Sequence, residues 1–209
     1  VGYIEGAGDK VPVALGQMGY EVTILKEKDL AMPYLAQFDA IITGVRAYNV
    51  NEFMADRYDA LMQYVSGGGN LIVQYNTSNF ISSVKSRMGP YPFSISRNRV
   101  TDEKAEVRFL LPNHPVLNFP NKIGPADFDG WIQERGIYFA EAIDPAYQLP
   151  LSLNDPDEPE QRGSLIIADH GKGKFVYTGL VFFRELPAGV PGAYRLLANL
   201  IALNKNKVN

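Results

Sequence analysis

The chain has 209 residues, of which 46% are hydrophobic and 21% are charged, and this balance is typical of an ordinary globular protein. Its 20 Lys and Arg residues against 23 Asp and Glu residues give a net charge of -3, which argues against nucleic acid as a partner. No apolar run approaches the ~20 residues of a membrane-spanning helix, so we expect no membrane insertion. The absence of cysteine excludes disulfides and a thiol nucleophile.

The first third of the chain alternates predicted strands and helices. Apolar strands are predicted over residues 1–5, 21–25, 39–44 and 70–75, and helices over residues 11–18, 29–37 and 51–65. Strands that are apolar throughout and separated by helices indicate a parallel sheet covered on both faces. Because residues 1–5 already have the pattern of a buried strand, we expect this domain to be part of a longer protein.

The remainder of the chain differs from the first third in amino-acid composition. Residues 77–161 are rich in Pro, Asn and Asp, and we expect them to form a long insertion over the edge of the sheet, within one domain spanning residues 1–209. Residues 164–168 and 174–178 flank a glycine-rich turn and predict an antiparallel strand pair. A helix over residues 192–203 closes the chain.

Three sequence strings carry a resemblance to a known family: DAIITGVRAYN (residues 39–49), GGGNLIVQYN (residues 67–76) and GKGKFVYTG (residues 171–179). In this order they resemble class I glutamine amidotransferase-like domains, more narrowly the ThuA-like branch. The closest resemblance is to the domain that follows the deacetylase module in bacterial PIG-L (LmbE-like) sugar deacetylases. It implies a flavodoxin-like α/β fold, a three-layer sandwich with a mostly parallel open sheet and a long insertion after the fourth strand.

The catalytic motifs of the amidotransferases are missing. Those enzymes place a cysteine on a sharp turn after a central strand and a His-Pro-Glu triplet after a late strand, whereas this chain has Tyr-Asn-Thr-Ser over residues 75–78 at the first place. A hydroxyl of Thr77 or Ser78 would need a neighbouring base, and the only histidines are His114, in a turn, and His170, in the glycine-rich turn. We therefore assign no catalytic residue.

Ligands of open α/β sheets collect where the strands end at their carboxyl edge. The polar and aromatic residues that follow the predicted strands are the binding candidates, and they suit a hydroxyl-rich ligand. Arg46 could instead pair with an acid inside the protein, and Gly6-x-Gly8 lacks the third glycine of a dinucleotide motif and is interpreted as a turn. The candidates are Glu5, Arg46, Tyr48, Asn49, Gln74, Tyr75, Asn76 and Arg184.

Residues 127–135 hold the single tryptophan together with three acids, an amide and a guanidinium. A tryptophan face beside carboxylates is a common arrangement for sugar binding, so Asp129, Trp131 and Glu134 join the candidates. The alternative is that Trp131 anchors the insertion. Asp129 and Glu134 could serve glycoside hydrolysis only if they were held about 5 to 10 Å apart.

No metal site and no cofactor are predicted, because no cluster of converging ligands is visible and the acidic stretch 154–160 lacks the spacing of a calcium loop. The leading hypothesis is a non-catalytic accessory domain that binds carbohydrate or docks against a covalently linked or separate deacetylase module. Two alternatives stay open: a hydrolase or isomerase of sugar derivatives that uses Glu5, Asp129 and Glu134, and a purely structural interaction domain. The lack of cysteine is compatible with a periplasmic or secreted location without identifying the compartment.

Overall fold

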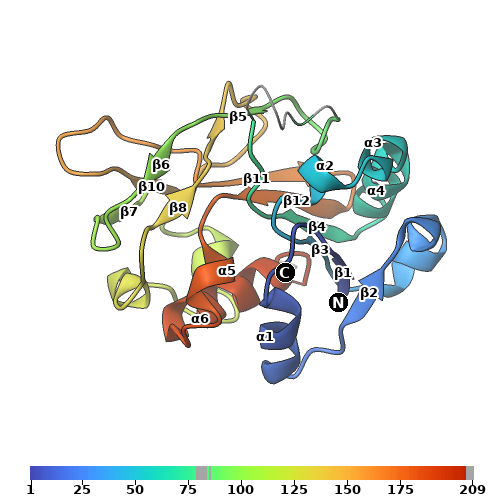
Figure 1. The fold of residues 1–209 in the computed structure, drawn as a ribbon, viewed down its shortest axis with the longest axis horizontal. Helices are drawn as coiled ribbons and strands as arrows, with labels where there is room; N and C mark the ends of the chain where they lie inside the picture. Colours follow the sequence, from blue (N-terminus) through green and yellow to red (C-terminus); the bar gives the residue numbers. More distant parts are fainter. Residues whose placement is uncertain (79–83, 85, 206–209) are drawn as a thin grey trace.

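The computed structural model describes residues 1–78, 84 and 86–205, and its centre is a six-stranded sheet (Figure 1). The strand order is β11-β12-β4-β3-β1-β2. All neighbours pair in parallel except β11 and β12, which form the predicted antiparallel pair. The strands are β1 (Gly2–Ile4), β2 (Thr23–Leu25), β3 (Ile41–Thr43), β4 (Asn70–Val73), β11 (Leu165–His170) and β12 (Gly173–Thr178).

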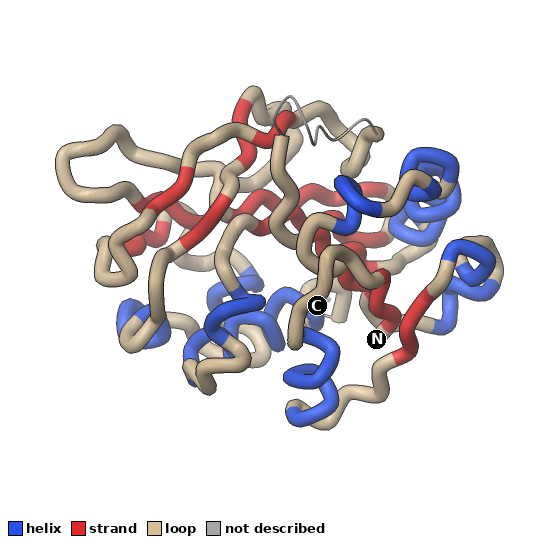
Figure 2. Tube along the Cα trace, in the orientation of Figure 1, coloured by secondary structure: helices blue, strands red, loops and turns tan. Residues whose placement is uncertain are grey.

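Helices cover both faces of this sheet (Figure 2). Ile42 and Ile72 pack on one face against α1 (Val11–Gln17) and α6 (Pro191–Ile201), while Ile41 and Leu71 point to the other face. That other face is covered by α2 (Ala47–Val50), α3 (Phe53–Asp56) and α4 (Tyr58–Ser66). The alternation of buried side chains along each strand therefore builds two cores, and the predicted three-layer α/β fold with a mostly parallel sheet is confirmed.

Two helix predictions were wrong. Residues 29–37 form no α-helix but two 3₁₀ turns, η1 (Glu27–Asp29) and η2 (Tyr34–Gln37), because Pro33 has no N–H to donate within a continuous helix. The predicted single helix over residues 51–65 is divided into α3 and α4 at Arg57. The short α2 before them was not predicted.

The insertion contains short strands that the sequence did not reveal, because each is only two or three residues long. They form three antiparallel ribbons; in Figure 1, β6, β7, β8 and β10 lie to the left of the sheet and β5 lies above it. The ribbons pair β7 (Val107–Phe109) with β10 (Leu151–Leu153), β5 (Ser94–Ile95) with β9 (Ala140–Glu141), and β6 (Arg99–Val100) with β8 (Gly136–Ile137). Two 3₁₀ turns, η3 (Pro115–Leu117) and η4 (Pro125–Phe128), lie between them along the chain.

A buried amide fastens the insertion to the closing helix. The side-chain Nδ2 of Asn199, on α6, donates to the main-chain oxygens of Val116 and Asn121 at 2.8 and 2.7 Å, and its Oδ1 accepts from the Asn121 N–H at 2.8 Å. These bonds satisfy backbone groups that would otherwise be buried without partners. The insertion and α6 therefore form one packed unit, which places residues 127–135 beside the short helix α5 (Phe182–Glu185).

Candidate functional site

The carboxyl ends of β1 and β3 are joined by the carboxylate of Asp9. It accepts hydrogen bonds from the Tyr3 hydroxyl at 2.7 and 2.8 Å, from the Val11 N–H at 2.9 Å and from the Val45 N–H at 3.0 Å. A Cβ on Gly6 would lie 2.0 Å from the Val45 carbonyl oxygen, so the close approach of these loops requires glycine. The structure thus supports the turn interpretation of Gly6-x-Gly8, and the Asp9 carboxylate at the end of this turn holds the loops together.

Glu5, the first candidate at this edge, has an exposed side chain that pairs with Lys26 Nζ at 2.6 Å. Its main-chain oxygen accepts a hydrogen bond from Asn51 Nδ2 at 2.7 Å. The carboxylate is therefore part of a surface ion pair with Lys26.

Four further candidates serve the architecture of the edge. Asn76 Oδ1 accepts from the Tyr48 N–H at 3.1 Å, and Asn76 Nδ2 donates to the Gln74 main-chain oxygen at 2.8 Å. Asn49 and Thr77 exchange a reciprocal pair of bonds, from Asn49 Nδ2 to the Thr77 oxygen at 2.7 Å and from the Thr77 N–H to Asn49 Oδ1 at 3.0 Å. These contacts tie the segment after β4 to α2.

The remaining candidates at this edge, Arg46, Tyr75, Glu134 and Arg184, belong to a cluster of aromatic and charged side chains, which we call the edge cluster. Its other members, Arg97, Gln133, Tyr138 and Phe183, were not among the candidates, because no motif in the sequence marks them individually. The Tyr75 and Phe183 rings stack with centroids 5.8 Å apart and an interplanar angle of 22°. Tyr138 meets Tyr75 edge-on at 5.9 Å. All three rings are half-buried and keep part of their surface open.

Polar groups surround these rings. Arg184 donates from Nε to Glu134 Oε1 at 2.9 Å and from Nη1 to Gln133 Oε1 at 2.6 Å, and its guanidinium lies 5.1 Å from the centre of the Phe183 ring. The Arg97 guanidinium lies 4.9 Å from the centre of the Tyr138 ring. Glu134 is 7% exposed, so its partner Arg184 supplies the charge compensation that a buried carboxylate needs.

The Tyr75 phenol responds to several members of the edge cluster. Burial raises its pKa, while Arg46 lowers it, Tyr138 and Glu134 raise it, and Arg184 lowers it. The net direction is upward, so the hydroxyl stays protonated at neutral pH. Tyr75 is therefore suited to donate a hydrogen bond to a ligand rather than to act as a base.

Two residues of the edge cluster have strained backbone conformations. In the described part of the chain, Arg46 (φ 58°) and Gln133 (φ 65°) are two of four non-glycine residues with left-handed φ. Such conformations cost free energy and are found preferentially at ligand and active sites. Both belong to the edge cluster, which favours a functional rather than a purely structural interpretation of it.

Trp131 is not a member of the edge cluster and is only 3% exposed. Its ring packs between Phe128 and Phe182, with centroid separations of 5.3 and 6.2 Å, and its Nε1 donates to the Asp127 main-chain oxygen at 2.9 Å. The structure supports the alternative in which Trp131 anchors the insertion, because neither face of the indole is open to a sugar.

A pocket of about 340 Å³ lies beside this tryptophan and is lined by Phe128, Asp129, Arg135 and Glu103, among others. Two donor groups of Arg135 are engaged by main-chain oxygens of Ala105 and Phe128. Asp129 is exposed and lines this pocket, whereas Glu134 is paired with Arg184. The two carboxylates proposed for glycoside hydrolysis therefore have different neighbours.

Neither histidine approaches the Thr77 turn. That turn follows the carboxyl end of β4, whereas His170 pairs with Gly173 at the start of β12, where Lys174 lies opposite Asn70 at the amino end of β4. His114 Nε2 contacts Gln148 Oε1 at 2.8 Å and its Nδ1 accepts from the Val116 N–H at 3.0 Å, which fits a structural role. A Ser/Thr hydrolase built on Thr77 would lack its base.

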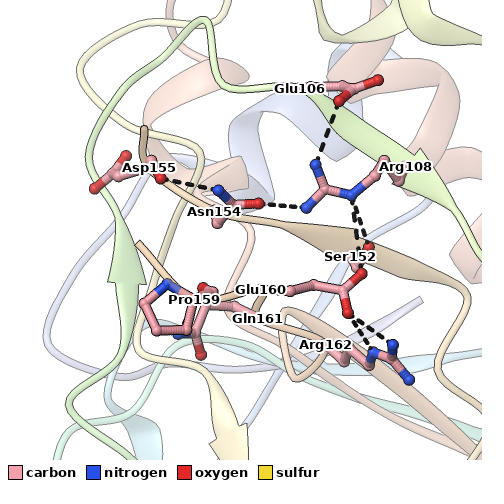
Figure 3. Close-up of polar contacts among 9 residues, drawn as sticks. All are labelled: Glu106, Arg108, Ser152, Asn154, Asp155, Pro159, Glu160, Gln161 and Arg162. Carbon is pink, nitrogen blue, oxygen red and sulfur yellow. Dashed lines mark hydrogen bonds and ion pairs between the residues drawn. The ribbon is translucent and has the colours of Figure 1, made fainter. Parts of the chain in front are cut away.

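The acidic stretch 154–160 is held by protein groups (Figure 3). Asp155 accepts from the Thr101 N–H at 2.9 Å and the Thr101 hydroxyl at 2.8 Å. Burial acts to raise the pKa of Asp155, but hydrogen bonds from the Asp102 N–H and from Thr101 lower it overall. In Figure 3, the Arg108 guanidinium forms ion pairs with the Glu106 and Glu160 carboxylates. It also donates hydrogen bonds to the Ser152 hydroxyl and the Asn154 side-chain oxygen. Among the residues that the structure describes, no group of three or more His, Cys, Asp or Glu side chains could hold a metal ion.

Over the same residues, no helix combines the length and apolar character needed to cross a membrane.

No protein-family model and no curated protein matches the sequence. Among solved structures, the chain is similar to the cytoplasmic protein STM3548 from Salmonella typhimurium, with a TM-score of 0.58, 14% identity and 96% of each chain covered. It is also similar to a putative ThuA-like protein from Bacteroides uniformis, with a TM-score of 0.54, 14% identity and coverage of 99% of this chain and 91% of that one. A β-galactosidase from Rahnella sp. R3 matches over 92% of this chain but only 26% of its own length, with 15% identity and a TM-score of 0.54. The chain therefore has a ThuA-like fold.

Proposed function

We propose that this chain is a non-catalytic accessory domain that binds carbohydrate through the edge cluster. The observation that carries the proposal is the stack of Tyr75 on Phe183, with Tyr138 against it and charged groups beside the rings. Aromatic surfaces pack against the apolar C–H faces of sugars, while guanidinium, carboxylate and amide groups bind their hydroxyls. The edge cluster combines both kinds of group at the carboxyl edge of the sheet, where open α/β folds bind their ligands.

Three features support binding without catalysis. The sequence has no cysteine, and Tyr75 stands after β4, where the resemblance places the amidotransferase nucleophile turn. Glu134 is neutralised by Arg184 rather than paired with a second acid. The hydrolase or isomerase alternative requires converging carboxylates, but Glu5 pairs with Lys26 and Asp129 lines the pocket beside Trp131.

The proposal extends to the partner of the domain. Resemblance to the domain that follows the deacetylase module in PIG-L-like proteins suggests that this domain is linked to, or docks on, a sugar N-deacetylase. In that arrangement the zinc-dependent reaction belongs to the deacetylase, and this domain holds the saccharide near it. The match to about a quarter of the Rahnella β-galactosidase is consistent with such a role, since it places a domain of this fold inside a much larger sugar-processing enzyme.

A thermal-shift screen against monosaccharides and oligosaccharides tests the binding proposal. A ligand at about 100 times its Kd stabilises the native state by about 2.7 kcal/mol, which raises Tm by several degrees. We expect such a rise for the wild-type domain and its loss in Tyr75→Ala. The matched control is Tyr34→Ala, because Tyr34 is 45% exposed on η2, outside the edge cluster.

Each result of the thermal-shift screen has a different meaning for the binding proposal. A shift that survives Tyr75→Ala would place the sugar elsewhere, and the pocket beside Trp131 would be the next candidate. No shift with any saccharide would contradict the binding proposal and leave a docking role. Trp131→Ala is unsuitable as a binding control, because the ring is buried and its removal disturbs the core.

A further inference from the structure

The edge cluster carries a net positive charge on a chain that is acidic overall. Its members include three guanidinium groups, from Arg46, Arg97 and Arg184, and one carboxylate, from Glu134, whereas the whole chain has a net charge of -3. A neutral sugar brings no opposite charge to Arg97 or Arg184. The charge therefore bears on which class of carbohydrate the cluster recognises.

Arg97 is the member best placed to meet an anion. It is exposed, and in the described part of the chain it forms no ion pair; its guanidinium lies 4.9 Å from the centre of the Tyr138 ring. The contact with an aromatic ring restrains the side chain without consuming its hydrogen-bond donors. A planar guanidinium held in this way can bind a carboxylate or phosphate through two parallel hydrogen bonds.

Arg184 adds a second guanidinium to the edge cluster, next to the Phe183 ring. Two of its donor atoms, Nε and Nη1, are used by Glu134 and Gln133, while Nη2 makes no hydrogen bond to the described residues. The side chain is 33% exposed. Because its two protein contacts fix the orientation of the guanidinium, a ligand that uses Nη2 meets a preorganised donor and loses less entropy on binding.

We infer that the ligand of the edge cluster is an anionic sugar, whose oxyanion pairs with Arg97 while its ring packs against Tyr75 and Tyr138. This inference rests on the proposed function and narrows its ligand class. A carboxylate on a uronic acid and a phosphate on a sugar phosphate offer the same oxyanion chemistry. The aromatic rings distinguish either one from a free inorganic anion, because they contribute only when a sugar ring is attached.

Isothermal titration of the domain at low salt with glucose, glucuronate, glucose 6-phosphate and inorganic phosphate tests this inference. We expect at least one anionic sugar to bind about tenfold or more tightly than glucose, a difference of about 1.4 kcal/mol, because only the anionic sugars add a charged hydrogen bond to Arg97. Arg97→Gln should remove most of that preference. Arg87→Gln is the matched control, because Arg87 is also exposed and also lies 4.9 Å from the centre of a tyrosine ring, that of Tyr58.

The results distinguish this inference from the proposed function. Whichever anionic sugar binds more tightly identifies the oxyanion as carboxylate or phosphate and supports the inference. Equal binding of glucose and both anionic sugars would overturn it while leaving carbohydrate binding intact. Inorganic phosphate that binds as tightly as the anionic sugars would contradict the role of the rings, and no binding of any compound would count against both proposals.

Discussion

Tyr75 stacks on Phe183, with ring centroids 5.8 Å apart and an interplanar angle of 22°. The contact joins the residue that follows the central strand β4 to the short helix α5, which comes after the last strand of the sheet. A ring held on one side by another ring has few conformations left to lose when a ligand packs on its remaining surface. The stack therefore makes the edge cluster a preorganised surface.

The stack should be measurable as a coupling in stability. We expect Tyr75→Ala and Phe183→Ala to destabilise the domain less when combined than the sum of the two single changes, by about 0.5 to 1.5 kcal/mol. Urea denaturation of the wild type, both single variants and the double variant gives this value. Tyr75→Ala combined with Tyr34→Ala should be additive, since these residues share no contact. Additivity of Tyr75 with Phe183 would show that the two rings do not interact in solution.

The burial of Trp131 leads to a second prediction. Trp131→Ala should lower the free energy of unfolding by about 3 to 5 kcal/mol, because it leaves a cavity between Phe128 and Phe182. The neighbouring Ile132→Ala should cost about 1 kcal/mol or less, since Ile132 is 37% exposed. Denaturation curves of the two variants provide the comparison, and a small effect of Trp131→Ala would contradict the anchoring role.

Two glycines in helices should respond in opposite directions to the same substitution. A Cβ on Gly192 of α6 would lie 1.7 Å from the Asp127 main-chain oxygen, so Gly192→Ala should separate α6 from the insertion and destabilise the domain strongly. A Cβ on Gly16 of α1 meets nothing within 4 Å, so Gly16→Ala should stabilise by about 0.5 to 1 kcal/mol. Melting temperatures of the two variants test this pair, and similar values would refute the close contact at Gly192.

The buried carboxyl of Glu185 predicts a pH dependence of stability. Burial raises its pKa to about 7 from its ordinary 4.5, although the Ile132 N–H, Arg135 and Arg184 act to lower it. The folded state therefore binds this proton more tightly than the unfolded state. The contribution of Glu185 to stability is greatest at and below pH 4.5, declines as pH rises through the interval up to about 7, and is constant above it.

Glu185→Gln should flatten that decline, because the amide stays neutral at every pH. The difference in unfolding free energy between variant and wild type should change by on the order of 1 to 3 kcal/mol between pH 5 and pH 8. Urea titrations at both pH values measure it, with the exposed Glu158→Gln as control. Parallel pH profiles for the wild type and Glu185→Gln would rule out this assignment.

Part of the candidate site was predictable and part was not. Arg46 and Tyr75 were found because each follows an apolar strand, and parallel strands end at a common edge. Tyr48, Gln74 and Asn76 follow the same rule, but all three are buried, and the amides of Gln74 and Asn76 bind backbone groups. The residue type alone does not distinguish an amide that binds a ligand from one that supports a loop. Trp131 is a second example, because its residue type suggested a sugar-binding face but the structure buries the ring.

The sequence by itself determined the layered α/β fold and the absence of thiol chemistry, because apolar periodicity is local and the presence of a residue type can be read directly. Only the tertiary structure decided the composition of the edge cluster. Tyr138, Phe183 and Arg97 reach Tyr75 through an insertion of very short strands and through α5, and no local pattern encodes such contacts. The packing of the insertion on α6, and not any motif, brings these side chains together.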